Sequence, residues 1–254
     1  MQVTFLGTGT SGGVPLIGCR CEVCRSTDPR DKRLRTSILL QTKTQTISVD
    51  CGPDFRQQML REEVNHLDAI LMTHMHKDHT GGLDDIRSFN FIHKKPVDIY
   101  CDYPTELGIK EQYSYAFTET DYPYLPRMTF HRIQNSEFRI QNFDIVPIQV
   151  MHATMPVLGY RFGKDFTYIT DAKTIAKEER DKIRGTKILV LNALRETEHY
   201  SHLTVQQAIE IAEDINPEVT YFTHMSHQFG FHREMEKRLP ANIRIAYDGL
   251  KISV

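Results

Sequence analysis

Four side chains of the kind that bind metal ions lie within six residues of this chain, in the run His74-Met75-His76-Lys77-Asp78-His79. The run follows the apolar segment 69–73, which we expect to be a strand. Residues i and i+2 of an extended backbone project from the same face, so His74 and His76 can converge on one ion. Asp78 and His79 come from the following turn and can face a second ion. A fold built around this run must bring further ligands to the end of that strand.

Other candidate ligands also come directly after predicted strands. They are His152 after the apolar run 145–151, Asp171 after 166–170 and His224 after 219–223. Each of them taken alone is more often structural, because an Asp after a strand is often only a cap. Strand ends that each deliver one ligand describe instead a single rim of a sheet layer, and that rim would carry a binuclear metal site.

The rest of the pattern predicts strand pairs that alternate with helices in a layered α/β fold. We expect a hairpin over 244–254, because Asp248-Gly249 is a strong turn signal. The clearest helix is Val205–Ile215, whose apolar residues recur at helical spacing after Thr204 as the N-cap. The other strands are expected at 2–6, 37–40, 46–50, 68–73, 97–100, 138–151 in two runs, 159–162, 166–170, 187–191 and 219–223.

The glycine-rich segment Gly7–Gly13 formally matches a dinucleotide-binding fingerprint. That fingerprint needs a helix to begin in the loop, but Pro15 and Gly18 follow instead, so we expect a tight loop. Shorter helices are expected after residue 54 and at Thr80 or later, the second with residues 84–86 inside it.

The composition places the chain among ordinary globular proteins. Of its 254 residues 40% are hydrophobic and 25% are charged, and no stretch approaches the roughly 18 apolar residues that a membrane helix needs. The N-terminus lacks the basic start and apolar run of a signal peptide, so we expect one cytoplasmic domain over residues 1–254. The net charge of -2 gives no global positive field to hold a long nucleic acid.

Three cysteines crowd into a second cluster of metal-ligand residues. Cys19, Cys21 and Cys24 supply three thiolates, which in a cytoplasmic chain favour a metal over disulfides. A tetrahedral zinc needs a fourth ligand, and His227 is our candidate. Redox-active thiols and a second functional metal are the alternatives.

The run His-x-His-x-Asp-His with the downstream ligands resembles the metallo-β-lactamase-fold hydrolases, and the match spans nearly the whole chain. The resemblance implies a mixed α/β fold, an αββα sandwich, with two divalent metal ions, manganese or zinc, in the active site. In that family one ion would be held by His74, His76 and His152, the other by Asp78, His79 and His224, and Asp171 would bridge them. Position 76 is Glu in flavodiiron oxygen reductases, so His76 argues against redox chemistry, and Asp171 stands where many β-lactamases have Cys.

A narrower resemblance comes from the GTG loop, the three cysteines, Ser201-His202-Leu203 and the ending His-x-Ser-His-Gln at 224–228. These segments resemble the phosphoribosyl cyclic phosphate phosphodiesterases of phosphonate catabolism. In that family the three cysteines and the residue matching His227 hold one structural zinc, and His202 matches a non-ligand general acid. We therefore expect a phosphodiesterase that cleaves a small, preferably cyclic, phosphodiester with a hydroxide shared by two metals. His202 and Asp78 are the catalytic candidates.

Two other functions stay open. One is an RNA-processing nuclease of the same fold, against which stand the net charge and the lack of a long basic arm. The other is a non-catalytic zinc-binding carrier or cofactor-biosynthesis protein, against which stands the intact ligand run. We expect a small-molecule substrate, no stable nucleic-acid partner and no membrane partner, and a homodimer is left open.

The remaining candidates are expected to be structural. Lys32, Arg33 and Arg35 form a basic run that we expect to be solvated, with a phosphate contact as the alternative. Asp50 either orients a ligand histidine or satisfies backbone groups, and the tyrosine-rich segment 112–126 is either a lid or an ordinary loop. Packed thiols are expected at Cys51 and Cys101, and surface positions at His66, His93, His131 and His232.

Overall fold

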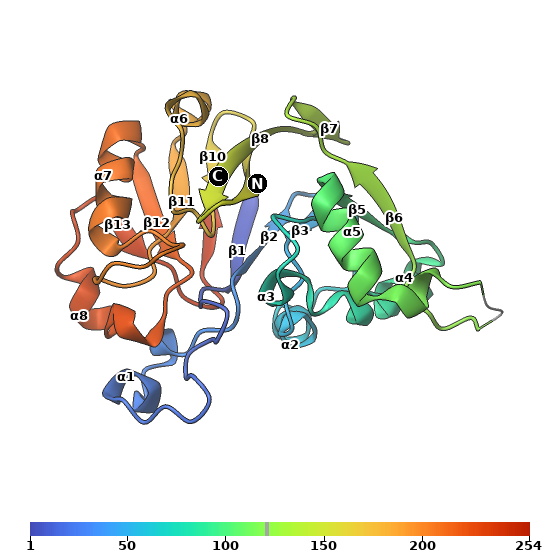
Figure 1. Ribbon diagram of the computed structural model, residues 1–254, viewed down its shortest axis with the longest axis horizontal. Coiled ribbons are helices and arrows are strands. Elements are labelled where there is room, and N and C mark those ends of the chain that lie inside the picture. The colour runs from blue at the N-terminus through green and yellow to red at the C-terminus, as the bar shows by residue number, and fades with distance from the viewer. Residues whose placement is uncertain (120–121) are drawn as a thin grey trace.

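The computed structural model describes residues 1–119 and 122–254, and within them two seven-stranded sheets pack face to face (Figure 1). In spatial order the first sheet contains β14 (Lys251–Ser253), β1 (Gln2–Gly7), β2 (Ser37–Gln41), β3 (Thr46–Val49), β4 (Ala69–Leu71), β5 (Val97–Cys101) and β6 (Met128–Arg132). The second contains β13 (Ile243–Ile245), β12 (Val219–Thr223), β11 (Ile188–Asn192), β10 (Phe166–Tyr168), β9 (Met155–Phe162), β8 (Phe143–His152) and β7 (Phe138–Ile140).

Helices cover the outer face of each sheet, which gives the expected αββα sandwich (Figure 1). Beside the first sheet lie α2 (Phe55–Arg61), α3 (Lys77–Thr80), α4 (Arg87–His93) and α5 (Tyr103–Gln112), and beside the second α6 (Lys177–Ile183), α7 (Val205–Ile215) and α8 (His232–Glu236). The short helix α1 (Glu22–Arg25) contacts the 3-10 turn η4 (His227–Phe229). Further 3-10 turns are η1 (Pro29–Asp31), η2 (Leu83–Ile86) and η3 (Ser114–Phe117). No helix in the described ranges is long and apolar enough to cross a membrane.

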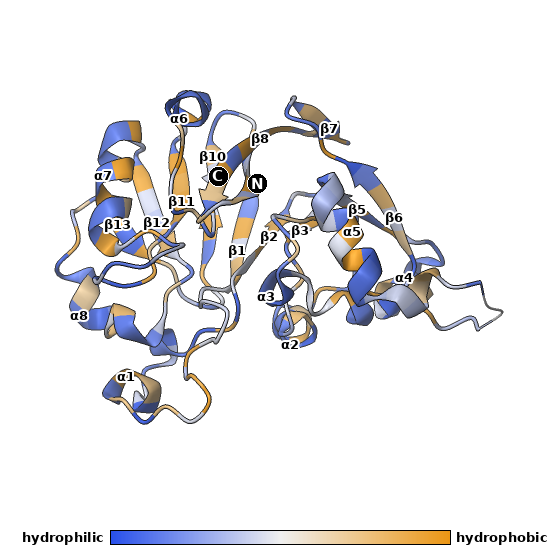
Figure 2. Cartoon of the chain, in the orientation of Figure 1, coloured by the Kyte–Doolittle hydropathy of each residue, from blue (hydrophilic) through white to orange (hydrophobic). Residues whose placement is uncertain are grey.

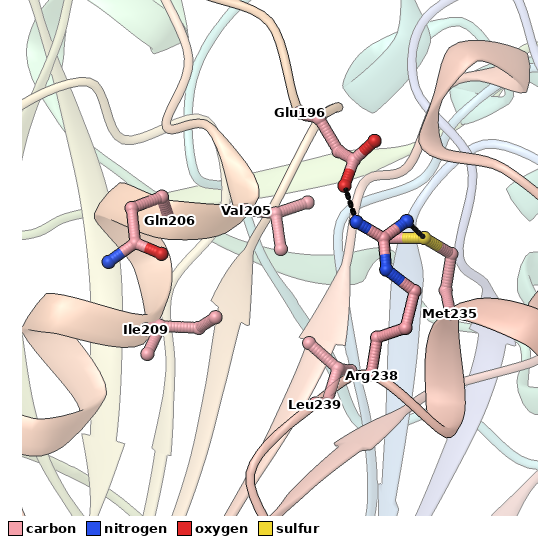
Figure 3. A pocket seen from close by; sticks show the side chains of 7 residues that line it. All are labelled: Glu196, Val205, Gln206, Ile209, Met235, Arg238 and Leu239. Carbon is pink, nitrogen blue, oxygen red and sulfur yellow. Dashed lines mark hydrogen bonds and ion pairs between the residues drawn. The ribbon is translucent and has the colours of Figure 1, made fainter.

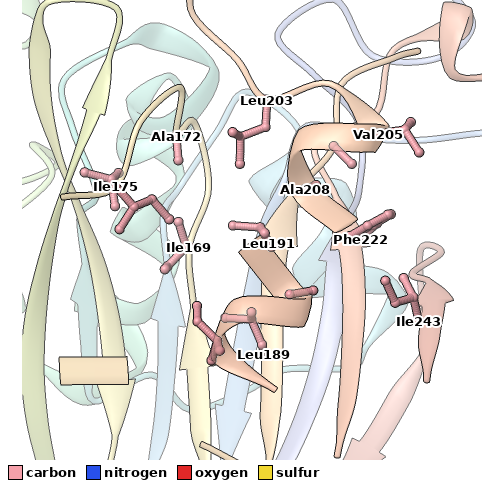
Figure 4. Packing of buried hydrophobic residues seen from close by; sticks show 14 of the residues in the cluster. Ile169, Ala172, Ile175, Leu189, Leu191, Leu203, Val205, Ala208, Phe222 and Ile243 are labelled. Atoms are coloured by element: carbon pink, nitrogen blue, oxygen red, sulfur yellow. The ribbon is translucent and has the colours of Figure 1, made fainter. Parts of the chain in front are cut away.

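Three clusters of buried apolar side chains hold these elements together, one between the sheets and one on the outer face of each sheet. Between the sheets, Phe5 of β1 and Tyr160 of β9 belong to one fully buried cluster. On the outer face of the second sheet, Leu191 and Phe222 pack with Ala208 of α7 (Figure 4). Figure 2 shows β11 as hydrophobic along its length and α6 as largely hydrophilic, as expected of a buried strand and a surface helix.

Helix α7 has the bounds that its periodicity predicted. The side chain of Thr204 accepts the N–H of Gln207 at 3.2 Å, and the side chain of Gln207 accepts the N–H of Thr204 at 3.0 Å. This reciprocal capping box satisfies two N–H groups that the first helical turn leaves free. Asn216, with φ of 53°, ends the helix.

The glycine-rich segment is a tight loop, as expected. A Cβ at Gly7 would lie 2.0 Å from the carbonyl oxygen of Arg35, so only glycine fits there. Within the described residues no helix begins in this loop, and the first one, α1, starts at Glu22.

The predicted hairpin over 244–254 is wrong. β13 pairs in parallel with β12 in the second sheet, whereas β14 pairs antiparallel with β1 in the first. The chain therefore crosses between the sheets here, because its two apolar segments complete different sheets. The helix expected at Thr80 or later also differs, since α3 begins at Lys77 and the next segments are η2 and α4.

The expectation of a solvated basic run is wrong for Arg33, whereas Lys32 and Arg35 are half-buried. Arg33 is 4% exposed and donates to the hydroxyl of Thr8 and the carbonyl of Ala246. Arg35 pairs with Asp54 at 3.1 Å. His232, expected at the surface, is 1% exposed. Their partners come from distant segments, which a local charge pattern does not reveal.

Candidate metal centre

The candidate ligands lie where strands of both sheets end. His74, His76, Asp78 and His79 follow β4 of the first sheet. His152 is the last residue of β8 in the second sheet. Asp171 and His224 follow β10 and β12 of the same sheet. The site is therefore assembled only when the two sheets pack together.

The backbone at this rim is strained. Asp50, Ala153, Asp171 and His224 all have left-handed backbones, with φ of 67°, 54°, 57° and 57°. Such conformations cost non-glycine residues on the order of 1–3 kcal/mol each and persist where the surroundings enforce them. The strain thus falls on, or next to, the residues that carry the candidate ligands.

One group of ligand atoms gathers around Asp171. The ligand atoms of Asp78, His79, Asp171 and His224 all lie within 4.8 Å of one another. Asp171 reaches Nε2 of His79 with one oxygen and Nε2 of His224 with the other, each at 3.2 Å. A bridging carboxylate needs this two-sided placement.

The other expected trio is less closely gathered. His74 Nε2 lies 2.9 Å from His76 Nδ1, and the ring centre of His152 is 5.9 Å from that of His74 and 5.3 Å from that of His76. Nδ1 of His152 donates to the carbonyls of Asp171 and Ser201, at 3.1 and 3.0 Å. These bonds leave Nε2 of His152 free to act as a ligand.

His202 lies closer to the candidate ligands than sequence reasoning indicated. Its ligand atom gathers with those of His152 and Asp171 within 4.8 Å, and its Nδ1 is 3.8 Å from Asp171 Oδ1. Burial and the neighbouring His224 lower the pKa of His202 to about 3. The ring is therefore neutral at pH 7 unless an anion comes close to it.

In this buried cluster the negative charges of the carboxylates and the positive charges of the histidines stabilise one another. Burial disfavours the ionised form of Asp171, but His224 and His79 outweigh it and hold its pKa well below the usual range. Burial likewise opposes protonation of His79, yet Asp171 and Asp78 raise its pKa well above the ordinary value. A positive charge is thus favoured at this position.

Orphaned nitrogen atoms show that the residues fit divalent metal ions. Among the described residues, His79 Nε2, His202 Nδ1 and both ring nitrogens of His224 are buried without a hydrogen-bond partner. Leaving a buried polar atom unpaired costs about 1–3 kcal/mol. Imidazole and carboxylate are the ligands that zinc and manganese take, so bound ions would satisfy these atoms.

Asp50 has both of the roles that the sequence left open. Its Oδ2 lies 2.7 Å from His79 Nδ1, and its Oδ1 accepts the backbone N–H of Thr73 at 2.8 Å. The first contact directs Nε2 of His79 toward Asp171. The contact of Thr73 with Asp50 and the contact of the Ser201 carbonyl with His152 were missed, because a hydroxyl or carbonyl partner has no sequence signature.

The second cluster, which we call the cysteine knuckle, consists of Cys19, Cys21, Cys24 and His227. Their ligand atoms lie within 4.8 Å of one another. His227 Nδ1 is 3.3 Å from the sulfur of Cys21 and 3.6 Å from that of Cys19. The N–H of Cys24, together with His227, lowers the pKa of Cys21 to about 6. A thiolate is thus favoured before any metal binds. Cys51 and Cys101 are packed thiols, as expected.

The tyrosine-rich segment 112–126 lies partly outside the described residues, at 120–121. Tyr113 is buried and donates to the carbonyl of Thr80, and Gln112 donates to the carbonyl of Met75. The start of the segment therefore packs behind the ligand run. A role as a lid stays a prediction.

A pocket between α7 and α8 is lined by no residue of either cluster (Figure 3). It encloses about 280 Å³ and has an apolar wall that includes Val205, Ile209 and Leu239. Glu196 and Arg238 pair across it at 2.5 Å. No histidine or cysteine among the described residues lines it.

Residues 45–225 match the family model described as the beta-lactamase superfamily domain. An octanoyltransferase of Porphyromonas gingivalis is 39% identical over 254 residues, which cover 99% of this chain and 51% of that protein. A ribonuclease Z of Acaryochloris marina is 31% identical over 166 residues, 63% of this chain and 47% of that protein. The chain thus spans about half the length of these curated relatives.

Among solved structures, a diphosphatase from the PhnP family superposes with a TM-score of 0.93 at 39% sequence identity. The match covers 100% of this chain and 97% of that one.

Proposed function

Since the chain belongs to the metallo-β-lactamase superfamily, we propose that it is a metal-dependent phosphodiesterase that hydrolyses a small, cyclic phosphodiester. The observation that carries the proposal is the ring of buried, unpaired histidine nitrogens around Asp171. These atoms come from both sheets, and Nε2 of His79 and Nε2 of His224 each lie 3.2 Å from the carboxylate of Asp171.

The residues fall into two sets around Asp171. His74, His76 and His152 would hold one divalent ion, Asp78, His79 and His224 the other, and Asp171 would bridge them. The cysteine knuckle would hold a structural zinc. Because these ligands run from Cys19 to His227, we take residues 1–254 as one hydrolase unit.

Two bound divalent ions would supply an activated water and would neutralise the charge that develops on the phosphoryl group. Within the chain, Asp50 keeps the His79 ring in place, and the carbonyls of Asp171 and Ser201 fix the tautomer of His152. Nδ1 of His202 lies 3.8 Å from Oδ1 of Asp171. We assign to His202 the role of donating the proton that a leaving alkoxide needs. The approach of the anionic phosphate would raise the pKa of His202, so that the ring takes up this proton.

The relatives support phosphoester chemistry. One solved relative is described as a diphosphatase and one curated relative as a ribonuclease, whereas the octanoyltransferase is about twice as long as its match to this chain. Octanoyl transfer is therefore not proposed for this chain. A nuclease is the second candidate because of the ribonuclease match, although the net charge of -2 gives RNA no general attraction.

The test is a substrate panel with manganese- or zinc-loaded protein: cyclic and linear nucleoside phosphodiesters, a short RNA, an octanoyl thioester and bis-nitrophenyl phosphate. Turnover of the cyclic diester with slow or absent RNA cleavage is expected. Preferred cleavage of RNA would replace the proposal by the nuclease, and hydrolysis of the thioester alone would refute it.

The role of His202 has its own signature. A nitrophenolate leaves without a proton, whereas a sugar alkoxide does not, so His202→Ala should reduce kcat/KM for the sugar diester by roughly 10²- to 10⁴-fold and far less for the nitrophenyl ester. The matched control, His76→Ala, should impair both substrates alike. An equal loss on both substrates for His202→Ala would make His202 a metal-supporting residue.

A further inference from the structure

Within the described part of the chain no hydrogen bond fixes the ring of His224, which stacks on His202 with 4.7 Å between the ring centres. His79 is held by Asp50 and His152 by two carbonyls, but both ring nitrogens of His224 lack hydrogen-bond partners among the residues that the structure describes. Its backbone is left-handed, with φ of 57°, a conformation that needs enforcement from outside. The hydrogen bonds that hold His224 in position must therefore come from the neighbouring peptide groups.

The enforcing contact comes from the loop after β1. The N–H of Met225 donates to the carbonyl of Thr8 at 2.9 Å, and the carbonyl of Met225 accepts the N–H of Thr10 at 3.1 Å. On the opposite side, the N–H of Ala193 donates to the carbonyl of Thr223. The backbone of Met225, the residue after His224, is thus clamped by Thr8 and Thr10.

Thr8 is in turn fixed by buried charge. Its hydroxyl donates to Oδ1 of Asp248 at 2.8 Å and accepts from Nη1 of Arg33 at 2.9 Å. Oδ2 of Asp248 accepts the N–H of Leu34 at 2.7 Å. Thr8 is 0% exposed, so no water can replace these bonds. This network connects the segment around Thr8, near the N-terminus, with Asp248, near the C-terminus.

We infer that Thr8 and Asp248 are positioning residues that fix the backbone presenting His224 to the metal cluster. Nε2 of His224 lies 3.2 Å from Asp171 Oδ1, so a small rotation of the peptide would move the ring out of the shared site. The inference rests on the proposed function only in taking His224 as a metal ligand. Neither residue touches the cluster itself.

The two kinds of metal site can be followed separately with cobalt(II). Thiolate ligands give cobalt intense near-ultraviolet charge-transfer absorption, whereas nitrogen and oxygen ligands give only weak visible bands. In a cobalt titration of Thr8→Val and of Asp248→Asn, we expect the affinity of the catalytic cluster for one of its ions to fall about tenfold. Loss of a partner that orients a metal ligand has an effect of this size. The thiolate absorption of the cysteine knuckle should be unchanged.

Thr220→Val is the matched control. Thr220 is a buried threonine of β12, four positions before His224, and its hydroxyl has no hydrogen-bond partner in the described ranges. Its replacement should leave both cobalt signals as in the unchanged protein. The inference would be overturned if Thr8→Val and Asp248→Asn bound cobalt in the catalytic cluster with an affinity within twofold of that of the unchanged protein. Equal weakening of both cobalt signals would also overturn it, because it would indicate a general loss of structure. An unchanged protein that gives the thiolate signal alone would refute the proposed function itself.

Discussion

At the scale of single residues, His232 is a buried base held against a buried cation. Its Nδ1 lies 3.4 Å from Nη2 of Arg33, and its backbone N–H donates to Asp31 at 2.7 Å. Nδ1 must accept from the guanidinium, so the ring is neutral. Burial and Arg33 together lower its pKa to about 4.

This histidine predicts a loss of stability in acid. An unfolded histidine has a pKa of about 6.5, so the unfolded chain binds more protons than the folded one between pH 6.5 and about 4. Stability then falls as pH is lowered through that window, by up to about 3 kcal/mol from this residue. His232→Gln, which keeps an acceptor for Arg33, should lack this part of the slope.

The measurement is denaturant unfolding of both proteins between pH 4.5 and 7.5, all at matched metal concentration. The free energy of unfolding of the unchanged protein should drop relative to that of His232→Gln as pH falls. Parallel curves for the two proteins would show that the pKa of His232 is the same in the folded and unfolded states, which would contradict the prediction.

Single residues also show where sequence reasoning stops. The ligand types in the run 74–79 were visible because their spacing has a direct geometric meaning. Arg33 was expected to be solvated, since its local neighbours are basic, but its acceptors are Thr8 and Ala246, 25 and 213 positions away. Burial of a charge depends on such distant partners, which no local pattern specifies.

At the scale of elements, the cysteine knuckle joins α1 to η4. His227 begins η4 and lies three positions after His224, so one short segment serves both clusters. Ser226 fastens the same segment to the second sheet through the carbonyl of Leu194, which accepts its N–H at 3.1 Å. A metal in the knuckle would therefore restrain the backbone near the catalytic cluster from a second direction.

Cys21→Ser tests this coupling. It should release the knuckle zinc and lower turnover several-fold, although Cys21 is not in the catalytic cluster. Cys101→Ser is the control for loss of a thiol, because Cys101 is a buried thiol of β5 that belongs to neither cluster. Zinc loss from Cys21→Ser with turnover and thermal midpoint unchanged would disprove the coupling. Metal content is measured by elemental analysis.

Elements were predictable where their signal is local. Most strands and α7 follow from apolar spacing and capping, and α7 has its expected bounds. Strand β6 (Met128–Arg132) was not expected. Helix α5 was missed because it has little amphipathic periodicity, although Asp102 caps it and a proline follows in its first turn. The strands with which β13 and β14 pair could not be predicted from the local sequence, because strand pairing depends on how the whole sheets assemble.

At the scale of the whole molecule, the two sheets meet at the candidate metal cluster. The first supplies His74, His76, Asp78 and His79, and the second supplies His152, Asp171 and His224. Ions bound between them would stabilise the packed state and not the unfolded chain. Metal binding and the packing of the sheets are then one linked equilibrium.

We therefore expect three tightly bound metal ions per chain, two in the catalytic cluster and one in the cysteine knuckle. An ion present at about 1,000 times its dissociation constant contributes about 4 kcal/mol to stability. In a domain of this size about 1 kcal/mol corresponds to roughly 2–4 °C in thermal midpoint, so chelation should lower the midpoint by well over 10 °C. Elemental analysis and scanning calorimetry before and after chelation check both numbers.

The variant His79→Ala separates the catalytic ions from the knuckle ion. It removes a ligand that lies between Asp78 and Asp171 and leaves the four knuckle residues intact. One zinc per chain should remain, and the thermal midpoint should respond less to chelator than in the unchanged protein. If protein purified without chelator holds no more than one metal and takes up none on reconstitution, the binuclear assignment fails. The orphaned histidine nitrogens at the meeting point of the sheets would then need another explanation.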